Sequence, residues 1–309
     1  MIIYADPMYT TEEQAKIRLD IFHWLEMKRD EHAGISKESL LSDYSYLGQH
    51  IPLLDRYKGI HNPQIFNETL SVVSTLNSKY EDNETLEGMI LYDYQATSDA
   101  HGNTKLRLAY ARRTPIVYLL ETSKGFYWPY INVIVLGDDT ATKKFVLDFR
   151  NTDDAERVFD ESINALPTTE IQKKYAIQQT RRRVHQPAFR SRVITAYAEQ
   201  CAICRLQHTT LLDAAHILPD SHELGKPVVS NGLALCKIHH AAYDKKIIGI
   251  SPDFKVQVSE SVLREVDGPM LKHGIQEMHG VSLHLPKAKN ELPNPEFLEI
   301  QFNKFLETV

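Results

Sequence analysis

The sequence predicts an α+β protein of two domains, a β-rich domain behind a helical lead-in at residues 1–165 and a second domain at residues 166–309. Three observations support this prediction. A helical pattern opens the chain, apolar runs recur through residues 89–149, and cysteine and histidine residues at regular spacing mark the second half. At 309 residues with 42% hydrophobic content, the chain is long enough to bury two cores.

The helical lead-in begins at Thr10-Thr11-Glu12-Glu13, which is a capping-box pattern. Apolar residues then recur at helical spacing up to about Glu31, so that one face can pack against a core. These residues are Ile17, Ile21, Phe22 and Leu25. A second, short helix is expected near residues 36–41.

Four apolar segments follow and predict strands separated by turns at residues 99–103, 123–125 and 137–139. The predicted strands are residues 89–94, 115–120, 128–135 and 145–149. We expect them to form a compact β domain. A helix at residues 155–165 and a break at residues 166–170, which contain Pro167, would then end this domain.

All three cysteines of the chain fall into one pattern, Cys201-x2-Cys204, a gap of 31 residues, and Cys236-x2-His239. Structural zinc takes four ligands in a tetrahedron, and a pair of ligands two residues apart on a tight turn can supply two adjacent corners. Buried core thiols would rarely be spaced in this way. The pattern therefore predicts a structural Zn²⁺ site, in which four protein ligands leave no open position.

The residues between and after these pairs indicate chemistry beyond a structural ion. Residues 211–217 predict a short strand that places His216 near its end, before Pro219 stops the ladder. A turn-rich loop at residues 220–230 leads to Asn231 and a second apolar strand. His240 and Asp244 are four residues apart in a predicted helix, so their Cβ atoms lie roughly 6 Å apart on one face and can bind one divalent ion.

The segment from about residue 180 to 250 resembles the HNH endonucleases, which have the ββα-metal fold. Quoted from this sequence, the matching stretches are Arg-Arg-Arg-Val-His-Gln-Pro-Ala-Phe-Arg, Cys-Ala-Ile-Cys, Asp-Ala-Ala-His-Ile, Asn-Gly-Leu-Ala-Leu-Cys and His-His-Ala-Ala-Tyr-Asp. The resemblance implies that His216 is a general base, Asn231 a loop-fixing amide and His240 a metal ligand. Asp244 matches a position where some members place a second ligand.

The chain departs from the family at Ala215, because many members carry Asp or His immediately before the catalytic histidine as another ligand. The ion would then be held by His240, Asp244 and water, with Asp213 as a weaker candidate. Phosphodiester hydrolysis needs a base, and neutral imidazole with a reference pKa of ~6.5 can take a proton from water near neutral pH. A hard ion such as Mg²⁺ or Mn²⁺ would stabilise the charge on the phosphate and the leaving oxygen. A lone histidine among the fourteen in the chain would more often be structural, but the spacing favours catalysis.

The net charge of −6 is divided unevenly along the chain. Residues 1–170 contain 17 Lys and Arg against 27 Asp and Glu, whereas residues 171–309 contain 18 against 14. Seven basic residues and no acidic ones lie between residues 171 and 192, in a stretch with helical character from 180 to 198 that Pro187 interrupts. They are Lys173, Lys174, Arg181, Arg182, Arg183, Arg190 and Arg192. A solvated helix face is the common explanation of such a run, but its position beside the nuclease motif favours binding to the phosphates of double-stranded DNA.

Residues 55–63 and 106–135 look similar to the N-terminal domains of McrA-like type IV, modification-dependent restriction enzymes. This resemblance implies a mixed, barrel-like domain of the SRA/PUA-like group that reads modified bases. A modified cytosine would be flipped out and held between aromatic faces. The candidate base-reading residues are Tyr92, Asp93, Tyr94, Tyr127 and Trp128, for each of which simple strand packing is the competing explanation.

The sequence as a whole predicts a metal-dependent DNA endonuclease of restriction type. One HNH centre cuts one strand, so a homodimer is the simplest route to a double-strand break. Two alternatives stay open: an HNH nuclease of another role that cuts unmodified DNA, and a non-catalytic, zinc-stabilised DNA-binding protein. No basic segment followed by an apolar run opens the sequence and no stretch is apolar enough to span a membrane, which predicts a cytoplasmic location. Alternating segments at residues 255–258 and 281–285 and a final helix at residues 296–307 are expected to extend the nuclease domain.

Overall fold

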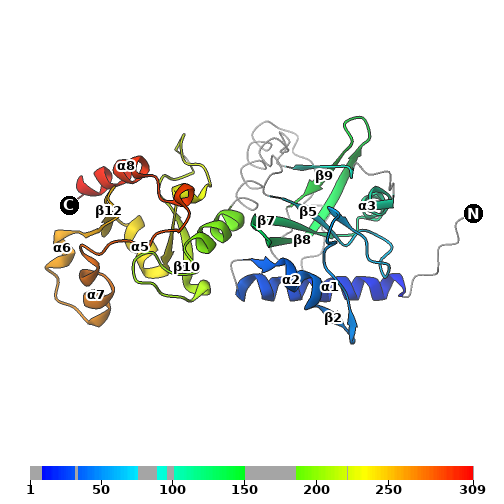
Figure 1. Cartoon of the computed structure of the whole chain (residues 1–309), viewed down its shortest axis with the longest axis horizontal. Helices are drawn as coiled ribbons and strands as arrows, with labels where there is room; N and C mark the ends of the chain where they lie inside the picture. The colour runs from blue at the N-terminus through cyan, green and yellow to red at the C-terminus, as the bar shows by residue number, and fades with distance from the viewer. Residues whose placement is uncertain are drawn as a thin grey trace, which may run out of the picture. The chain divides into compact units, whose positions relative to one another are not determined.

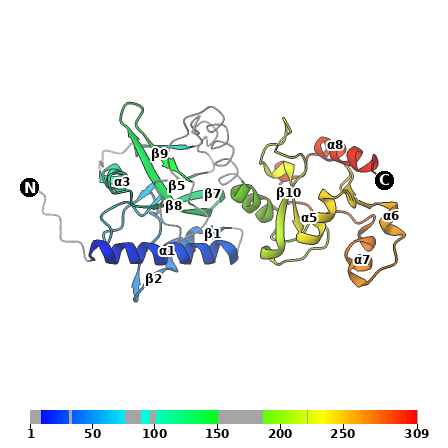
Figure 2. The same ribbon diagram turned by 180° about the vertical axis from the view of Figure 1, so that it is seen from behind.

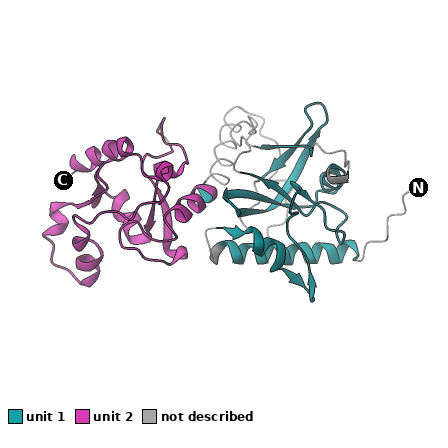
Figure 3. Cartoon of the chain, viewed as in Figure 1, with its two compact units in different colours: residues 1–30, 34–187 teal, residues 31–33, 188–309 magenta. Residues whose placement is uncertain are grey.

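The computed structural model describes residues 9–31, 34–75, 89–95, 101–149, 186–220 and 222–308 (Figure 1). The chain divides into two compact units, residues 1–30 with 34–187 and residues 31–33 with 188–309 (Figure 3). The domain boundary expected at residue 165 and the helix expected at residues 155–165 lie outside the described residues. Within the described ranges, no helix combines the length and apolar composition needed to cross a membrane.

The first unit opens with α1 (Thr11–Glu31), and the predicted capping box is confirmed. The Thr10 amide donates to Glu13 Oε2 at 2.7 Å, and the Glu13 amide donates back to Thr10 Oγ1 at 3.3 Å. The short β1 (Ile35–Ser36) precedes α2 (Lys37–Ser42), where Ser36 Oγ accepts from the Ser39 amide as the N-cap. A small hairpin of β2 (Ser45–Tyr46) and β3 (Gln49–His50) follows.

A seven-stranded mixed sheet forms the rest of this unit, in the order β4-β5-β7-β8-β9-β6 with β1 paired to β8. Its strands are β4 (Ile60–His61), β5 (Ser71–Ser74), β6 (Ile90–Asp93), β7 (Ile116–Ser123), β8 (Phe126–Asp139) and β9 (Lys144–Asp148). The pairing of β5 with β7 is parallel and the other pairings are antiparallel. The long β8 pairs with β7 along its first part and with β9 along its second part, so it carries the sheet around a corner (Figure 2).

The sheet curls until its two ends approach each other. The Tyr92 hydroxyl on β6 lies 3.0 Å from the Gly59 carbonyl oxygen and 3.2 Å from the Val73 carbonyl oxygen, which belong to the opposite end of the strand order. One face of the sheet packs on α1 through a core that includes Ile21, Leu25 and Leu119. The unit is therefore α+β with a barrel-like curvature.

Two of the turns predicted in this unit are wrong. Residues 137–139 belong to β8, whose pairing with β9 continues to Asp139, and the turn follows at residues 140–143. Residues 99–103 were expected to form only a turn, but α3 (His101–Arg112) begins there. Gly102 and Asn103 favour a turn by composition, yet Asn103 is buried and bonds to the backbone of Gln95 at both its amide and its carbonyl. Tertiary burial of Leu106 and Ala109 holds the helix in place.

The second unit is built around a helix at residues 186–196, which precedes η2 (Thr209–Leu211), β10 (Leu212–His216), η3 (Val229–Asn231), β11 (Gly232–Cys236) and α5 (Lys237–Asp244). Strands β10 and β11 pair antiparallel with His216 opposite Gly232 and Leu212 opposite Cys236. Gly232 allows the helix to approach the strand closely, because a Cβ atom there would lie 2.4 Å from Val193 Cγ2. The two strands and α5 form the predicted ββα arrangement.

The remaining elements extend this unit, as expected. They are β12 (Ile248–Ile250), β13 (Val256–Val258), α6 (Glu260–Leu263), α7 (Pro269–Gly274), η4 (Gln276–Met278), η5 (Lys289–Glu291) and α8 (Pro295–Leu306). α8 packs on β12, where a Cβ at Gly249 would lie 2.5 Å from Phe305 Cδ1. Residues 281–285 alternate in sequence but form no continuous strand, and they contribute an isolated bridge from Ser282 to Lys255. The backbone there instead bonds to separate segments, for example from His284 N to Ala202 O.

Candidate active site and metal centre

The ligand atoms of Cys201, Cys204, Cys236 and His239 gather within 4.8 Å of one another. His239 Nδ1 lies 3.5 Å from Cys201 Sγ and 3.2 Å from Cys236 Sγ, while the Cys204 and Cys236 sulfurs are 4.0 Å apart. Tetrahedral bonds of about 2.3 Å to sulfur and about 2.0 Å to nitrogen require ligand separations of roughly 3.5–3.8 Å. The four side chains therefore fit a tetrahedral metal ion.

Local structure explains how these four residues converge. Cys201 and Cys204 belong to a tight turn in which the Arg205 amide donates to the Cys201 carbonyl, and Cys236 is the N-cap of α5. His239 is buried in the first turn of that helix, and its Nε2 lies 2.8 Å from the carbonyl oxygen of Gly274. This bond places a proton on Nε2 and leaves Nδ1 facing the sulfurs, which is the usual way a second partner orients a ligating imidazole.

His216 lies at the end of β10, with its ring stacked on the Phe189 ring at 4.0 Å between centroids and 20° between planes. Its Nε2 is 3.0 Å from Asp220 Oδ1. Burial lowers the pKa of His216, the nearby Asp220 charge opposes this effect, and His240 adds to it. The net shift is downward, so the imidazole is neutral at neutral pH and can accept a proton.

Asn231 is fully buried and joins the two ends of the loop that follows His216. Its Oδ1 accepts from the Leu218 amide at 2.9 Å, and its Nδ2 donates to the carbonyls of Leu218 and Lys226 at 3.0 Å each. The Ile217 amide also donates to the Asn231 carbonyl. These hydrogen bonds hold together the two ends of the loop that follows His216.

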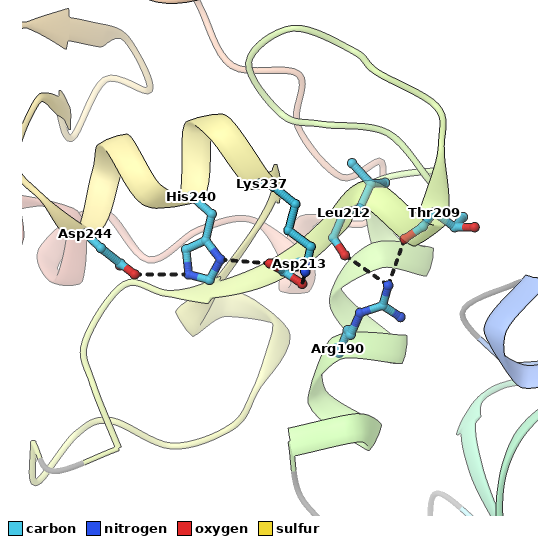
Figure 4. Close-up of polar contacts among 7 residues, drawn as sticks. All are labelled: Arg190, Thr209, Leu212, Asp213, Lys237, His240 and Asp244. Atoms are coloured by element: carbon cyan, nitrogen blue, oxygen red, sulfur yellow. Dashed lines mark hydrogen bonds and ion pairs between the residues drawn. The ribbon is translucent and has the colours of Figure 1, made fainter.

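His240 on α5 is flanked by two carboxylates (Figure 4). Its Nε2 is 3.4 Å from Asp244 Oδ2, one helical turn along, and its Nδ1 is 3.3 Å from Asp213 Oδ2 on β10. Ligands on adjacent corners of an octahedral Mg²⁺ site are about 3 Å apart, given bonds of about 2.1 Å. The His240 and Asp244 side chains therefore fit as two neighbouring ligands of a hard divalent ion.

Both carboxylate oxygens of Asp213 are paired with a lysine. Lys237 Nζ contacts both of its oxygens, at 2.6 Å and 2.7 Å. Partial burial alone would raise the pKa of Asp213, but hydrogen bonds from Lys237 and His240 lower it overall, so the carboxylate is ionised. Ala215, which stands where many family members carry a ligand, is fully buried in the core opposite Leu233.

The predicted phosphate-binding run is described only in part. Lys173, Lys174, Arg181, Arg182 and Arg183 lie outside the described residues. Arg190 donates to the carbonyl oxygens of Thr209 and Leu212 at 2.7 Å and 2.9 Å, so its guanidinium ties the helix to β10 (Figure 4). The Arg190 guanidinium is therefore engaged within the unit. Arg192 is half-buried.

The first unit contains a cavity of about 230 Å³ between its curled sheet ends. Three of the predicted base-reading residues, Tyr92, Asp93 and Tyr94, line it, together with Tyr118. Tyr127 and Trp128 do not line it, and they are only 6% and 8% exposed. Tyr127 instead packs in the core against α1. The structure therefore brings three of the five candidates together and separates the other two.

Three residues of the site were not identified from the sequence. Phe189 stacks on His216, Asp220 approaches its Nε2, and Lys237 holds Asp213. Only the four-residue spacing of Asp220 from His216 could have drawn attention to it. The other two contacts join different elements and leave no local pattern.

The second unit contains a stretch that matches a known protein family. Residues 201–251 match the family model of the HNH endonuclease, HNH_2. This stretch is an HNH endonuclease domain. It spans the metal cluster, β10, β11 and α5, so the chain carries the catalytic domain of a nuclease. No curated protein sequence matches the chain.

Two solved structures show a low similarity to parts or most of the chain. The modification-dependent TagI restriction endonuclease is 13% identical with a TM-score of 0.30, and the match covers 88% of this chain and 92% of that one. The type IV phosphorothioation-dependent restriction endonuclease ScoMcrA is 16% identical with a TM-score of 0.21, and the match covers 60% of this chain and 51% of that one. Neither TM-score is high enough to establish a shared fold.

Proposed function

We propose that this protein is a metal-dependent DNA endonuclease whose first unit restricts cutting to DNA that contains a modified cytosine. The observation that carries the nuclease part is the placement of a neutral His216 and of the His240–Asp244 pair on the ββα core of an HNH domain. In this proposal Cys201, Cys204, Cys236 and His239 hold a structural Zn²⁺ that takes no part in the reaction.

The reaction assigned to these residues is phosphodiester hydrolysis. His216 takes a proton from the attacking water, because its lowered pKa keeps the imidazole unprotonated at neutral pH. Phe189 fixes the plane of that imidazole, and Asn231 fixes the loop beside it. Bound by His240 and Asp244, Mg²⁺ or Mn²⁺ would supply positive charge to the scissile phosphate and the leaving oxygen.

The reader part of the proposal rests on the cavity in the first unit. A volume of about 230 Å³ accommodates a single nucleobase, and the walls include the rings of Tyr92, Tyr94 and Tyr118. Aromatic walls hold a flipped base by stacking and exclude water from its edge. Together with the sequence resemblance, this cavity supports an SRA/PUA-like reader that binds modified cytosine.

The test is cleavage of matched plasmids that contain cytosine, 5-methylcytosine or 5-hydroxymethylcytosine, with Mg²⁺ or Mn²⁺. We expect the wild type to cut a modified plasmid only and His216→Ala to cut none. Tyr94→Ala should lose the preference, whereas Phe126→Ala, on an exposed side chain outside the cavity, should keep it. Equal cutting of all plasmids would retain the nuclease and refute the reader, and binding without cutting would refute the assigned chemistry.

The proposed oligomer is a homodimer, because one HNH centre cuts one strand. Sedimentation of the protein on a short modified duplex should give two chains per DNA, and the product should be a linear plasmid. A monomer that only nicks the plasmid would contradict this part of the proposal.

A further inference from the structure

Four charged or titratable side chains form one continuous line of contacts across β10 and α5 (Figure 4). Lys237 Nζ contacts both oxygens of Asp213, Asp213 Oδ2 faces His240 Nδ1, and His240 Nε2 faces Asp244 Oδ2. The order of these contacts assigns different roles to the two carboxylates. Asp244 lies on the side of the imidazole where an ion would bind, and Asp213 lies on the opposite side.

We propose that Asp213 is a positioning residue that holds His240 in the Nδ1–H tautomer, and that Lys237 anchors Asp213 for this role. Both ring nitrogens of His240 face a carboxylate, but only the Nδ1–Asp213 contact of 3.3 Å has hydrogen-bond geometry, whereas the Nε2–Asp244 contact of 3.4 Å is an ion-pair distance alone. Because an ionised carboxylate can only accept a hydrogen bond, the proton of a neutral imidazole is then on Nδ1. The lone pair is then on Nε2, which faces Asp244. This inference rests on the proposed binding of a divalent ion by His240 and Asp244, and it replaces the weak ligand role that the sequence suggested for Asp213.

The position of Lys237 supports this assignment. Lys237 is the first residue of α5, directly after Cys236, and the β10–β11 register places Asp213 opposite Leu235. The ammonium group therefore reaches Asp213 from the turn that joins strand to helix. The Lys237 ammonium group contacts both carboxylate oxygens of Asp213 and competes with an ion for them. Asp213 Oδ2 still lies within reach of the His240 imidazole.

Burial distinguishes this contact from ordinary surface pairing. The side chains of Asp213 and His240 are 25% and 26% exposed, so their contact is largely shielded from water. A second Lys–Asp pair in the same unit, Lys255 with Asp253, is 57% and 61% exposed and contacts no histidine among the described residues. It provides a matched control for loss of a lysine–aspartate pair.

The test is long-range proton–nitrogen-15 NMR of the His240 ring in zinc-loaded protein without the second ion. We expect mainly the Nδ1–H tautomer in the wild type and a shift toward Nε2–H in Asp213→Asn, with no change in Asp253→Asn. Lys237→Met keeps the carboxylate but removes its anchor, and it should shift the tautomer in the same direction by less. Dispersed amide spectra would establish that each variant is folded.

Calorimetric titration with Mn²⁺ provides the second readout. Loss of an orienting partner typically weakens metal binding about 10–100-fold, so Asp213→Asn should weaken Mn²⁺ binding by that factor. Weaker binding with an unchanged His240 tautomer would make Asp213 a direct ligand and overturn the inference. An Nε2–H tautomer in the wild type would also overturn it. Failure of the proposed function is distinguishable, because a wild type that binds no Mn²⁺ can still show the Asp213-dependent tautomer.

Discussion

Replacing Gly232 with alanine tests whether the close packing of the helix at residues 186–196 on β11 supports the catalytic histidine. The added Cβ would lie 2.4 Å from Val193 Cγ2 and 2.9 Å from Phe189 Cζ, and both distances are too short for carbon atoms. Overpacking of this kind costs about 1–3 kcal/mol. Replacing glycine with alanine also lowers the backbone entropy lost on folding, which stabilises the folded state by about 0.5–1 kcal/mol. The difference is a net loss of about 0–2.5 kcal/mol in the free energy of unfolding, and the very short 2.4 Å contact places the expected loss in the upper half of that range.

Val193→Ala provides the matched partner, since it removes the atom that the new Cβ meets first. Alone, it deletes two buried methyl groups at about 0.8 kcal/mol each and leaves a small cavity, for a total of about 2 kcal/mol. In the double variant the Cβ of residue 232 occupies part of that cavity. The double variant should therefore be more stable than the sum of the two single changes by about 1–2 kcal/mol.

Hydrogen exchange of β11 peptides, followed by mass spectrometry, measures these changes within the second unit. Both tryptophans of the chain, Trp24 and Trp128, belong to the first unit, so their fluorescence is an internal control that should not change. Cleavage should fall in Gly232→Ala, because the displaced Phe189 stacks on His216, and should partly recover in the double variant. Additive free energies, or unchanged cleavage in Gly232→Ala, would refute this account of the packing.

Three further predictions concern the site itself. Asn231→Ala removes three hydrogen bonds, two of them buried, worth about 1 kcal/mol each. Faster exchange of the Leu218 amide and a loss of about 3 kcal/mol in the free energy of unfolding are expected, and a loss below about 1 kcal/mol would show that the loop does not depend on the Asn231 side chain. Asp220→Asn removes a negative charge that raises the pKa of His216, so the pKa of His216 should fall further. The acidic limb of the pH–rate profile should therefore move to lower pH, and a shift to higher pH would contradict the assignment of His216 as the base. Cys204→Ser should lower the zinc content measured by mass spectrometry well below about one ion per chain and unfold the second unit, and retained zinc would exclude Cys204 as a ligand.

Much of the site could be predicted because its determinants are short in sequence. The Cys-x2-Cys and Cys-x2-His pairs each lie on one turn, and the four-residue step from His240 to Asp244 places both side chains on one face of any helix. The end of β10 at His216 follows from an apolar run stopped by a proline. Local geometry alone determines these relations, and the structure retains them.

The residues that line the cavity of the first unit could not be predicted from local sequence. Tyr92 and Tyr94, on and directly after β6, and Tyr127 and Trp128 on β8 have equally aromatic, strand-like surroundings in the sequence. Only the curl of the sheet places β6 against the opposite end of the strand order, which creates a cavity beside Tyr92 and buries Tyr127 against α1. No pattern within one strand encodes how far a sheet will curl.

The sequence by itself determined the nuclease class, the four side chains that converge with the spacing of a metal site, and the order of the ββα elements, because each depends on spacing within a few residues. The tertiary structure alone decided which partners surround them. Arg190, which the sequence places in a predicted DNA-binding run, bonds to the backbone of η2 and β10, and Asp213, the weaker candidate for a metal ligand, is held by Lys237. These outcomes depend on the β10–β11 register and on the packing of two helices, and such contacts between distant residues leave no periodic signal in the chain.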